Sequence, residues 1–251
     1  MLSAAEIDRF EREGYLHLRA AIPREVTVQC RRLADEQLGI ASDPQTWAGP
    51  VLRGLVGGEP LRDAANTPQL LEAVGQLLDG EDWSPRPNLG LFVVWFPSER
   101  DPADAGWHID SSYQRPGRDE WFVNYRSRAR GLLLLCLLSD VGADEAPTRI
   151  RPGSHTGVPP LLRRFGDEGV VGQHAPLPQA SQSVEIATGQ AGDVFLCHPF
   201  LVHAATWPHR GTAPRYVAQP PISLTGSLHL DGDPVGLSPV ARTVRATLGD
   251  S

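Results

Sequence analysis

Residues 192–203 read Gly-Asp-Val-Phe-Leu-Cys-His-Pro-Phe-Leu-Val-His, and the apolar run at 194–197 predicts a short buried β-strand. Glycine and proline separate this run from other β-rich runs, as in antiparallel β-proteins. We expect strands at residues 15–22, 89–96, 132–138, 184–186, 194–197 and 216–222. The spacing predicts an antiparallel sandwich or barrel whose core occupies about residues 86–225.

Helical patterns dominate the first 85 residues or so and return near the C-terminus. Ser3 and Glu6 form a capping-box pattern that opens a short helix ending near Gly14. We expect further helices at residues 23–38, 68–78 and 239–248. The sequence therefore predicts a mainly β fold with flanking N-terminal and C-terminal helices, organised as one domain over residues 1–251.

Composition excludes several classes of function. The formal net charge is −7, which gives no attraction to nucleic acids or anionic membranes, so we expect neither as a partner. All 23 basic residues are arginine, which excludes Schiff-base, pyridoxal-phosphate and P-loop lysine chemistry. The three cysteines are widely spaced and predict free thiols in a reducing cytoplasm. The start of the chain does not resemble a signal peptide, and no apolar run is long enough to span a bilayer.

A candidate metal site begins in Gly106-Trp107-His108-Ile109-Asp110. On an extended backbone, His108 and Asp110 point to the same side and could grip one ion. Two histidines and one carboxylate suit Fe(II), because they leave positions open for a chelating co-substrate and O₂. Such a site needs a third ligand in addition to His108 and Asp110. Trp107, between them, points to the opposite face of the extended chain, toward the core.

The segment 192–203 offers two histidines as the third ligand. His203 is followed after twelve residues by Arg215, and His198 is followed at the same spacing by Arg210. Pro199 interrupts the strand directly after His198, which favours His203. A planar guanidinium at Arg215 could bind the distal carboxylate of 2-oxoglutarate through two hydrogen bonds.

The stretch 111–130 follows the metal pair and could form a lid over the substrate. Tyr113 and Trp121 are the candidate substrate contacts. The stretch also contains Arg115, Arg118, Arg126, Arg128 and Arg130. These arginines could bind an anionic substrate, or they could belong to a solvated loop and pair with Asp119 and Glu120.

Several motifs together carry a family resemblance. They are Phe-Glu-Arg-Glu-Gly-Tyr at 10–15, His108-x-Asp110, Ala-Pro-Thr-Arg-Ile-Arg-Pro-Gly-Ser-His at 146–155, and the 192–203 strand leading to His203 and Arg215. In these motifs, and over nearly its whole length, the chain resembles the phytanoyl-CoA dioxygenase family. The family pattern places the third ligand at the second histidine of the 192–203 segment, which is His203.

The resemblance implies a double-stranded β-helix, or jelly roll, with Fe(II) bound by His108, Asp110 and His203. It implies that Arg215 binds the co-substrate 2-oxoglutarate and that O₂ is the oxidant. The expected reaction is hydroxylation of an unactivated C–H bond in a small-molecule metabolite of a biosynthetic pathway. Asp110 favours hydroxylation over halogenation, since the related halogenases replace this carboxylate with a small residue.

The chain departs from the family pattern in two places. Glu145-Ala146-Pro147 replaces the usual Asn-Gly-Pro, and Ala204-Ala205 replaces the Gly-Ser that commonly follows the distal histidine. Neither change touches a ligand. Two other functions could use the same ligands: a jelly-roll metal-binding protein without turnover, and a Zn-dependent hydrolase or isomerase. Arg215 favours the oxygenase, because neither alternative needs a carboxylate clamp.

Overall fold

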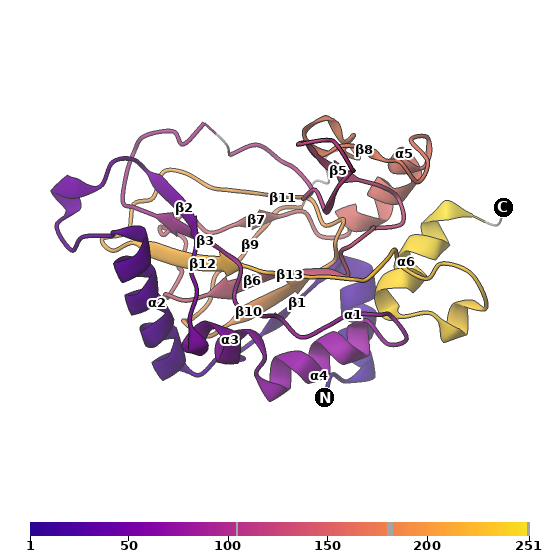
Figure 1. The fold of residues 1–251 in the computed structure, drawn as a ribbon, viewed down its shortest axis with the longest axis horizontal. Helices are drawn as coiled ribbons and strands as arrows, with labels where there is room; N and C mark the ends of the chain where they lie inside the picture. The colour runs from indigo at the N-terminus through magenta and orange to yellow at the C-terminus, as the bar shows by residue number, and fades with distance from the viewer. Residues whose placement is uncertain (104, 180–182, 250–251) are drawn as a thin grey trace.

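The main antiparallel sheet has seven strands in the computed structural model, which describes residues 1–103, 105–179 and 183–249 (Figure 1). Its order is β1 (Tyr15–Leu18), β10 (Val194–Cys197), β6 (Leu132–Leu137), β12 (Arg215–Gln219), β3 (Leu91–Trp95) and β2 (Val51–Leu55), and β13 (Pro221–Ile222) also pairs with β6. Strands distant in the sequence are thus neighbours, as in jelly rolls.

A second sheet of three strands has the order β11 (His203–Ala204), β7 (Arg149–Ile150) and β9 (Glu185–Ile186). His108 extends it through an isolated antiparallel bridge to His203. A third, small sheet contains β4 (Tyr113–Gln114), β5 (Trp121–Val123) and β8 (Val170–Val171). The predicted lid stretch therefore forms a hairpin of its own next to the second sheet (Figure 1).

Strand β6 shows why the main sheet and the second sheet face each other. Leu132 and Leu134 belong to the hydrophobic core shared with the helices, whereas Leu133 and Leu135 belong to a second cluster. That second cluster also contains Ile150 of β7. Both faces of β6 are thus buried, which explains its continuous apolar sequence. One face packs on helices and the other faces the second sheet.

The helices lie mainly on one side of the main sheet (Figure 1). They are α1 (Ala4–Glu13), α2 (Arg24–Leu38), α3 (Glu59–Ala65), α4 (Pro68–Leu77), α5 (Val158–Arg163) and α6 (Pro239–Leu248), with 3-10 turns at Pro44–Thr46, Ser154–Gly157, Gly172–His174 and Pro234–Gly236. The predicted capping box of Ser3 and Glu6 is present, and Ser238 accepts a hydrogen bond from the Ala241 amide at the start of α6.

The predicted mainly β fold with helices toward both ends of the chain is confirmed, with corrections to its boundaries. The strand expected at 15–22 ends at Leu18, because the chain turns at Ala20 with φ 48°. The run 216–222 is two strands that break at Pro220, which lacks an amide hydrogen for the ladder. Strand β2 was not predicted.

The sequence also predicted free cysteine thiols and no segment long enough to span a membrane. Cys30, Cys136 and Cys197 are buried free thiols, and burial raises the pKa of Cys30 to about 11. They are therefore inert core residues. Among the described residues, no helix is both long and apolar enough to span a bilayer.

Candidate metal centre

His108 and His203 are brought together by backbone pairing. Each residue donates its amide hydrogen to the carbonyl of the other, and both N–O distances are 3.0 Å. Residues directly opposite each other in an antiparallel pair project their side chains to the same face. The centroids of the two imidazole rings are accordingly 4.4 Å apart.

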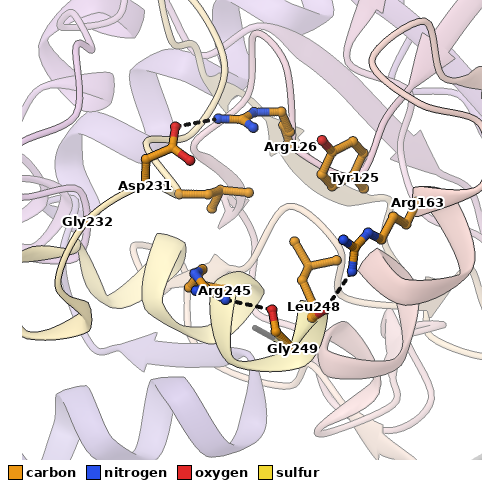
Figure 2. Close-up of a pocket in the computed structure, with 9 residues that line it drawn as sticks. Tyr125, Arg126, Arg163, Asp231, Gly232, Arg245, Leu248 and Gly249 are labelled. Atoms are coloured by element: carbon orange, nitrogen blue, oxygen red, sulfur yellow. Dashed lines mark hydrogen bonds and ion pairs between the residues drawn. The ribbon is translucent and has the colours of Figure 1, made fainter. Parts of the chain in front are cut away.

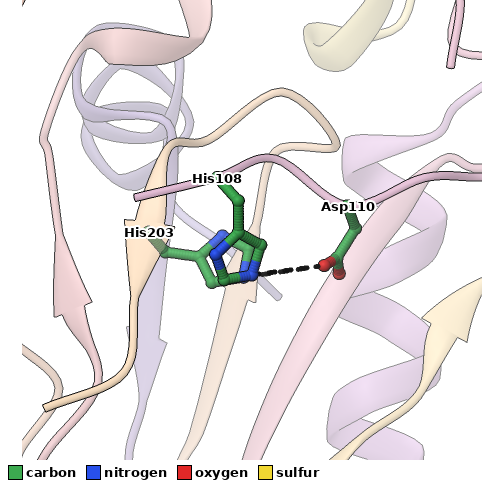
Figure 3. Close-up of side chains that lie close together, drawn as sticks. All are labelled: His108, Asp110 and His203. Carbon is green, nitrogen blue, oxygen red and sulfur yellow. Dashed lines mark ion pairs between the residues drawn. The ribbon is translucent and has the colours of Figure 1, made fainter. Parts of the chain in front are cut away.

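Asp110 completes the group from a position two residues beyond His108 (Figure 3). Its Oδ1 lies 3.7 Å from Nε2 of His108 and 3.8 Å from Nε2 of His203. One ligand atom from each of the three side chains lies within 4.8 Å of the others. Within the described part of the chain, no other such group of three forms. This is the two-histidine, one-carboxylate arrangement that suits Fe(II).

Hydrogen bonds of the two rings fix which nitrogen can bind a metal. Nδ1 of His108 lies 3.0 Å from the carbonyl of Gly106, and Nδ1 of His203 lies 3.0 Å from the carbonyl of Leu201. A carbonyl only accepts, so each Nδ1 carries the hydrogen and each Nε2 keeps its lone pair. Both lone pairs belong to the nitrogens that face Asp110.

Arg130 orients Asp110. Its Nη1 donates to Oδ2 of Asp110 at 2.9 Å, and its Nη2 donates to the carbonyl of Ser111 at 2.5 Å. Burial alone would raise the pKa of Asp110, but the positive charge of Arg130 and the two imidazoles outweigh it, so the pKa lies below its ordinary value. One carboxylate oxygen is thus fixed by Arg130 while the other faces the histidines.

Arg149 ties the segments carrying the ligands together. Its Nη2 donates to the carbonyls of Ala105 and Ala205, at 2.7 and 2.8 Å. These carbonyls lie just before His108 and just after His203 in the chain. Trp107 packs on the main core, as expected, and the Arg149 guanidinium lies 4.9 Å from its ring centroid.

A cavity of ≈ 140 Å³, here called the inner cavity, lies beside the two histidines. His108, His203, Thr148, Arg215 and Gln219 are among its lining residues. Arg215 occupies the first position of β12 and is 3% exposed. Arg215 therefore lines the same cavity as the two candidate ligands His108 and His203.

Arg215 is a buried cation without a counter-ion. Its Nη1 donates to the carbonyl of Ala146, its Nε has no hydrogen-bond partner, and no carboxylate of the described residues pairs with it. Burial lowers the pKa of Arg215 to about 9. A buried charge is costly unless it is paired, so this guanidinium fits an anionic ligand.

A second cavity, the outer cavity, has a volume of ≈ 590 Å³. Asp110, Arg130 and Trp121 help to line it, and Gln219 lines both cavities. Asp110 therefore faces the outer cavity while the two histidines face the inner one. The three candidate ligands lie where the cavities adjoin, which leaves room for one small molecule on each side.

The rival third ligand, His198, lies elsewhere. It is 1% exposed; its Nδ1 accepts from the Phe200 amide, and its Nε2 lies 3.0 Å from Oγ1 of Thr243. Arg210, its partner in the sequence argument, is exposed and lies 3.6 Å from a carboxylate oxygen of Glu99. His198 is therefore part of the contact with α6 and not of the metal group.

The two predicted substrate contacts differ in their surroundings. Trp121 lines the outer cavity and is 52% exposed. Tyr113 is buried, and its hydroxyl donates to the carbonyl of Glu168 at 2.9 Å. Tyr113 therefore anchors the hairpin to the segment before β8. Sequence reasoning could not see this, because Glu168 is 55 residues away in the chain.

Most arginines of the 111–130 stretch have partners close in space, and Arg118 uses one of the two acidic residues predicted for them. Arg115 pairs with Glu168, Arg118 with Glu120 and Arg126 with Asp231. Arg128 lies over the ring of Tyr113, 5.0 Å from its centroid. Arg130 instead points into the candidate site, a role that no local motif marked.

A further cavity of ≈ 270 Å³ lies beside the C-terminal part of α6 and shares no lining residue with the inner or outer cavity (Figure 2). Its cations have partners: Arg126 pairs with Asp231, Arg163 donates to the carbonyl of Leu248, and Arg245 donates to the carbonyl of Gly249. The contact between Arg163 and Leu248 joins the end of α5 to the end of α6.

Two facing antiparallel sheets with a two-histidine, one-carboxylate group between them define the class of non-haem iron oxygenases. The model of the phytanoyl-CoA dioxygenase family (PhyH) matches residues 10–217. The chain belongs to this family, and the resemblance seen in the sequence is confirmed. None of the curated proteins matches the chain.

Solved structures share the fold at low sequence identity. HygX from Streptomyces hygroscopicus, with nickel, 2-oxoglutarate and hygromycin B bound, is 16% identical over 89% of this chain and 88% of its own, with a TM-score of 0.59. EvdO2 from Micromonospora carbonacea var. aurantiaca is 14% identical over 93% and 96%, with a TM-score of 0.62. The epimerase SnoN, in complex with Fe³⁺, α-ketoglutarate and nogalamycin RO, is 16% identical over 88% and 82%, with a TM-score of 0.57.

Proposed function

We propose that this chain is a single-domain Fe(II)- and 2-oxoglutarate-dependent hydroxylase that oxidises an unactivated C–H bond of a small-molecule metabolite. One observation carries the proposal: His108 and His203 share a cavity with Arg215, a buried cation without an acidic partner among the described residues. A metal-binding protein without turnover and a zinc hydrolase have no use for such a cation.

The residues present fit both the metal and the co-substrate. Nε2 of His108, Nε2 of His203 and Oδ1 of Asp110 would hold Fe(II). The unpartnered Nε of Arg215 would donate to the distal carboxylate of 2-oxoglutarate in the inner cavity. When bound, Fe(II) with O₂ and 2-oxoglutarate supplies an oxidant strong enough for an unactivated C–H bond.

The chain's other contributions are positioning and exclusion of water. Arg130 holds Asp110 in one orientation, and Arg149 holds the segments carrying both histidines. The imidazole of His108 is 46% exposed, so a substrate in the adjoining outer cavity would itself cover this side of the metal. Hygromycin B bound to HygX and nogalamycin RO bound to SnoN support a small molecule as the substrate. We propose that this metabolite belongs to a biosynthetic pathway.

Anaerobic titration with Fe(II) and then 2-oxoglutarate tests the proposal through the visible charge-transfer band of the chelate. We expect the band in wild type and in His198→Ala, and its loss in His203→Ala. Arg215→Ala should require a much higher 2-oxoglutarate concentration. If wild type forms no band, the co-substrate assignment is wrong.

Admission of O₂ then separates the alternatives. The proposal predicts slow O₂-dependent conversion of 2-oxoglutarate to succinate even without a substrate. A chelate that forms but never consumes 2-oxoglutarate would indicate a metal-binding protein without turnover. Turnover of a metabolite under nitrogen with Zn²⁺ would indicate a hydrolase or isomerase.

A further inference from the structure

The outer cavity has a charged end, and only part of that charge serves the metal site. Arg86 and Arg130 both line it, next to Asp110 and Ser111. Arg130 is 8% exposed, and its Nε has no hydrogen-bond partner among the described residues. Once a metal ion binds the Asp110 carboxylate, that carboxylate balances the positive charge of Arg130 only in part.

Arg86 is held rigidly at this end. Pro85 and Pro87 flank it, and each fixes its own backbone φ angle. Asn66 clamps the backbone from both sides: its Oδ1 accepts from the Arg86 amide at 2.9 Å, and its Nδ2 donates to the Arg86 carbonyl at 2.6 Å. The backbone of Arg86 is therefore set before any ligand arrives, which lowers the entropy cost of binding.

The guanidinium of Arg86 has few hydrogen-bond partners among the described residues. Its Nη1 donates to Oγ of Ser223 at 3.4 Å, its Nε is buried without a partner, and no carboxylate of the described chain forms an ion pair with it. Burial, and secondarily the positive charge of Arg130, lower the pKa of Arg86. The two arginines thus repel each other across the cavity, and an anion between them would remove that repulsion.

The rest of the lining of the outer cavity is largely apolar. Leu55 is 77% exposed, Trp121 52% and Leu91 36%, although all three are large hydrophobic side chains. Leu133 and Pro221 continue this surface. Exposed apolar groups gathered in one concave place indicate a surface that a ligand covers.

We propose that the substrate is an amphipathic acid, with its carboxylate or phosphate bound between Arg86 and Arg130 and its apolar body against Leu55, Leu91 and Trp121. The inference rests on the proposed function, because it takes the outer cavity as the substrate side of the metal. With Fe(II) and dianionic 2-oxoglutarate in place, Arg86, Arg130, Arg215 and the metal still carry more positive charge than Asp110 and the co-substrate balance. An anionic substrate supplies the missing charge.

Calorimetric titration of the anaerobic Fe(II)·2-oxoglutarate complex tests this with three probes of the same chain length: octanoate, octyl phosphate and neutral octanamide. Excess 2-oxoglutarate keeps Arg215 occupied. We expect at least one of the two anions to bind roughly tenfold or more tightly than octanamide, because charge-assisted hydrogen bonds discriminate by at least that factor. The preferred anion tells a carboxylate from a phosphate.

Arg86→Met should weaken binding of the preferred anion by roughly tenfold or more, and should leave octanamide binding unchanged. Arg86→Lys keeps the charge and should retain part of the affinity. Arg32→Met, on the exposed face of α2, is the matched control and should bind like wild type. Circular dichroism and melting curves verify that each variant folds.

Equal binding of the anions and octanamide, no binding of any probe, or equal behaviour of Arg86→Met and Arg32→Met would overturn the proposal. The charge-transfer band, recorded on the same samples, reports separately on the proposed function. If that band is absent, the titrations are repeated on metal-free protein with Arg86→Met and Arg215→Met. Anion binding that depends on Arg86 then upholds recognition at this end of the outer cavity even though the oxygenase assignment has failed.

Discussion

Replacement of Arg215 by methionine should make the ligand-free protein more stable while strongly weakening its binding of 2-oxoglutarate. Arg215 is buried, its Nε has no partner, and no carboxylate of the described residues balances its charge. Methionine has a similar length and no charge, so it can fill the same space beside Trp95, above whose ring the guanidinium lies.

The magnitude follows from the pKa of Arg215. Burial lowers this pKa from an ordinary value of 12.5 to about 9, which corresponds to roughly 5 kcal/mol of unfavourable free energy for the charged side chain at neutral pH. The variant leaves the carbonyl of Ala146 without its donor, which costs about 1–3 kcal/mol. We therefore expect the free energy of unfolding to rise by about 2 kcal/mol or more.

Urea unfolding of metal-free protein at pH 7.5 measures this difference. Arg210→Met serves as the matched control, because Arg210 is exposed and pairs only loosely with Glu99; its free energy of unfolding should change by less than about 0.5 kcal/mol. In the presence of Ni²⁺, 2-oxoglutarate at a hundred times its Kd should stabilise wild type by about 2.7 kcal/mol. The same addition should leave Arg215→Met unchanged.

Two outcomes would refute the reasoning. If Arg215→Met unfolds at a lower urea concentration than wild type, the guanidinium stabilises the ligand-free fold. It is then not an unpaired charge that only a ligand would compensate. If 2-oxoglutarate stabilises wild type and Arg215→Met equally, the co-substrate carboxylate binds elsewhere.

Three further predictions concern stability. Burial lowers the pKa of His155 to about 4. As the pH falls below about 6.5, this histidine is protonated in the unfolded state but not in the folded state, so it alone should lower the free energy of unfolding by about 3 kcal/mol by pH 4. Urea unfolding of His155→Asn across this range should show a clearly shallower decline, and an unchanged decline would contradict the burial argument. Leu134→Ala, in the fully buried centre of β6, should lower the free energy of unfolding by about 3–5 kcal/mol; a loss below about 1 kcal/mol would mean that the core collapses to fill the space. Ala146 has φ 49° where the family pattern has glycine, so Ala146→Gly should relieve strain and raise the melting temperature by a few degrees, whereas a clear drop would show that the turn is unstrained.

Elements with local signals were predicted well. The first helix was recognised from Ser3 and Glu6, whose capping interactions lie within one turn. Strand β6 was recognised because burial on both faces leaves an uninterrupted apolar run. Strand β2 carries Arg53 and Gly54 in its middle and is held by pairing with β3, about 40 residues away. A contact at that distance leaves no local pattern.

In the candidate site, too, residues with local sequence signals were predicted and residues held by distant contacts were not. His108 and Asp110 were paired from a spacing of two residues on an extended backbone. The choice between His198 and His203 needed the family pattern as well, because the deciding contact is the backbone bridge between His108 and His203. Arg86 and Arg130 were not assigned to a common site, since the cavity that they share is formed only when distant segments meet.

The reciprocal backbone bonds between His108 and His203 have a consequence for how quickly an ion can be captured. Because sheet pairing sets the separation of the two imidazoles, capture of an ion requires no loop to close and no strand to order. Arg130 already holds the third side chain, Asp110, in one orientation. Arrival of the ion and loss of water from it are the remaining steps. In a cold or viscous medium, loading should therefore slow only as much as diffusion and water loss of the ion themselves slow.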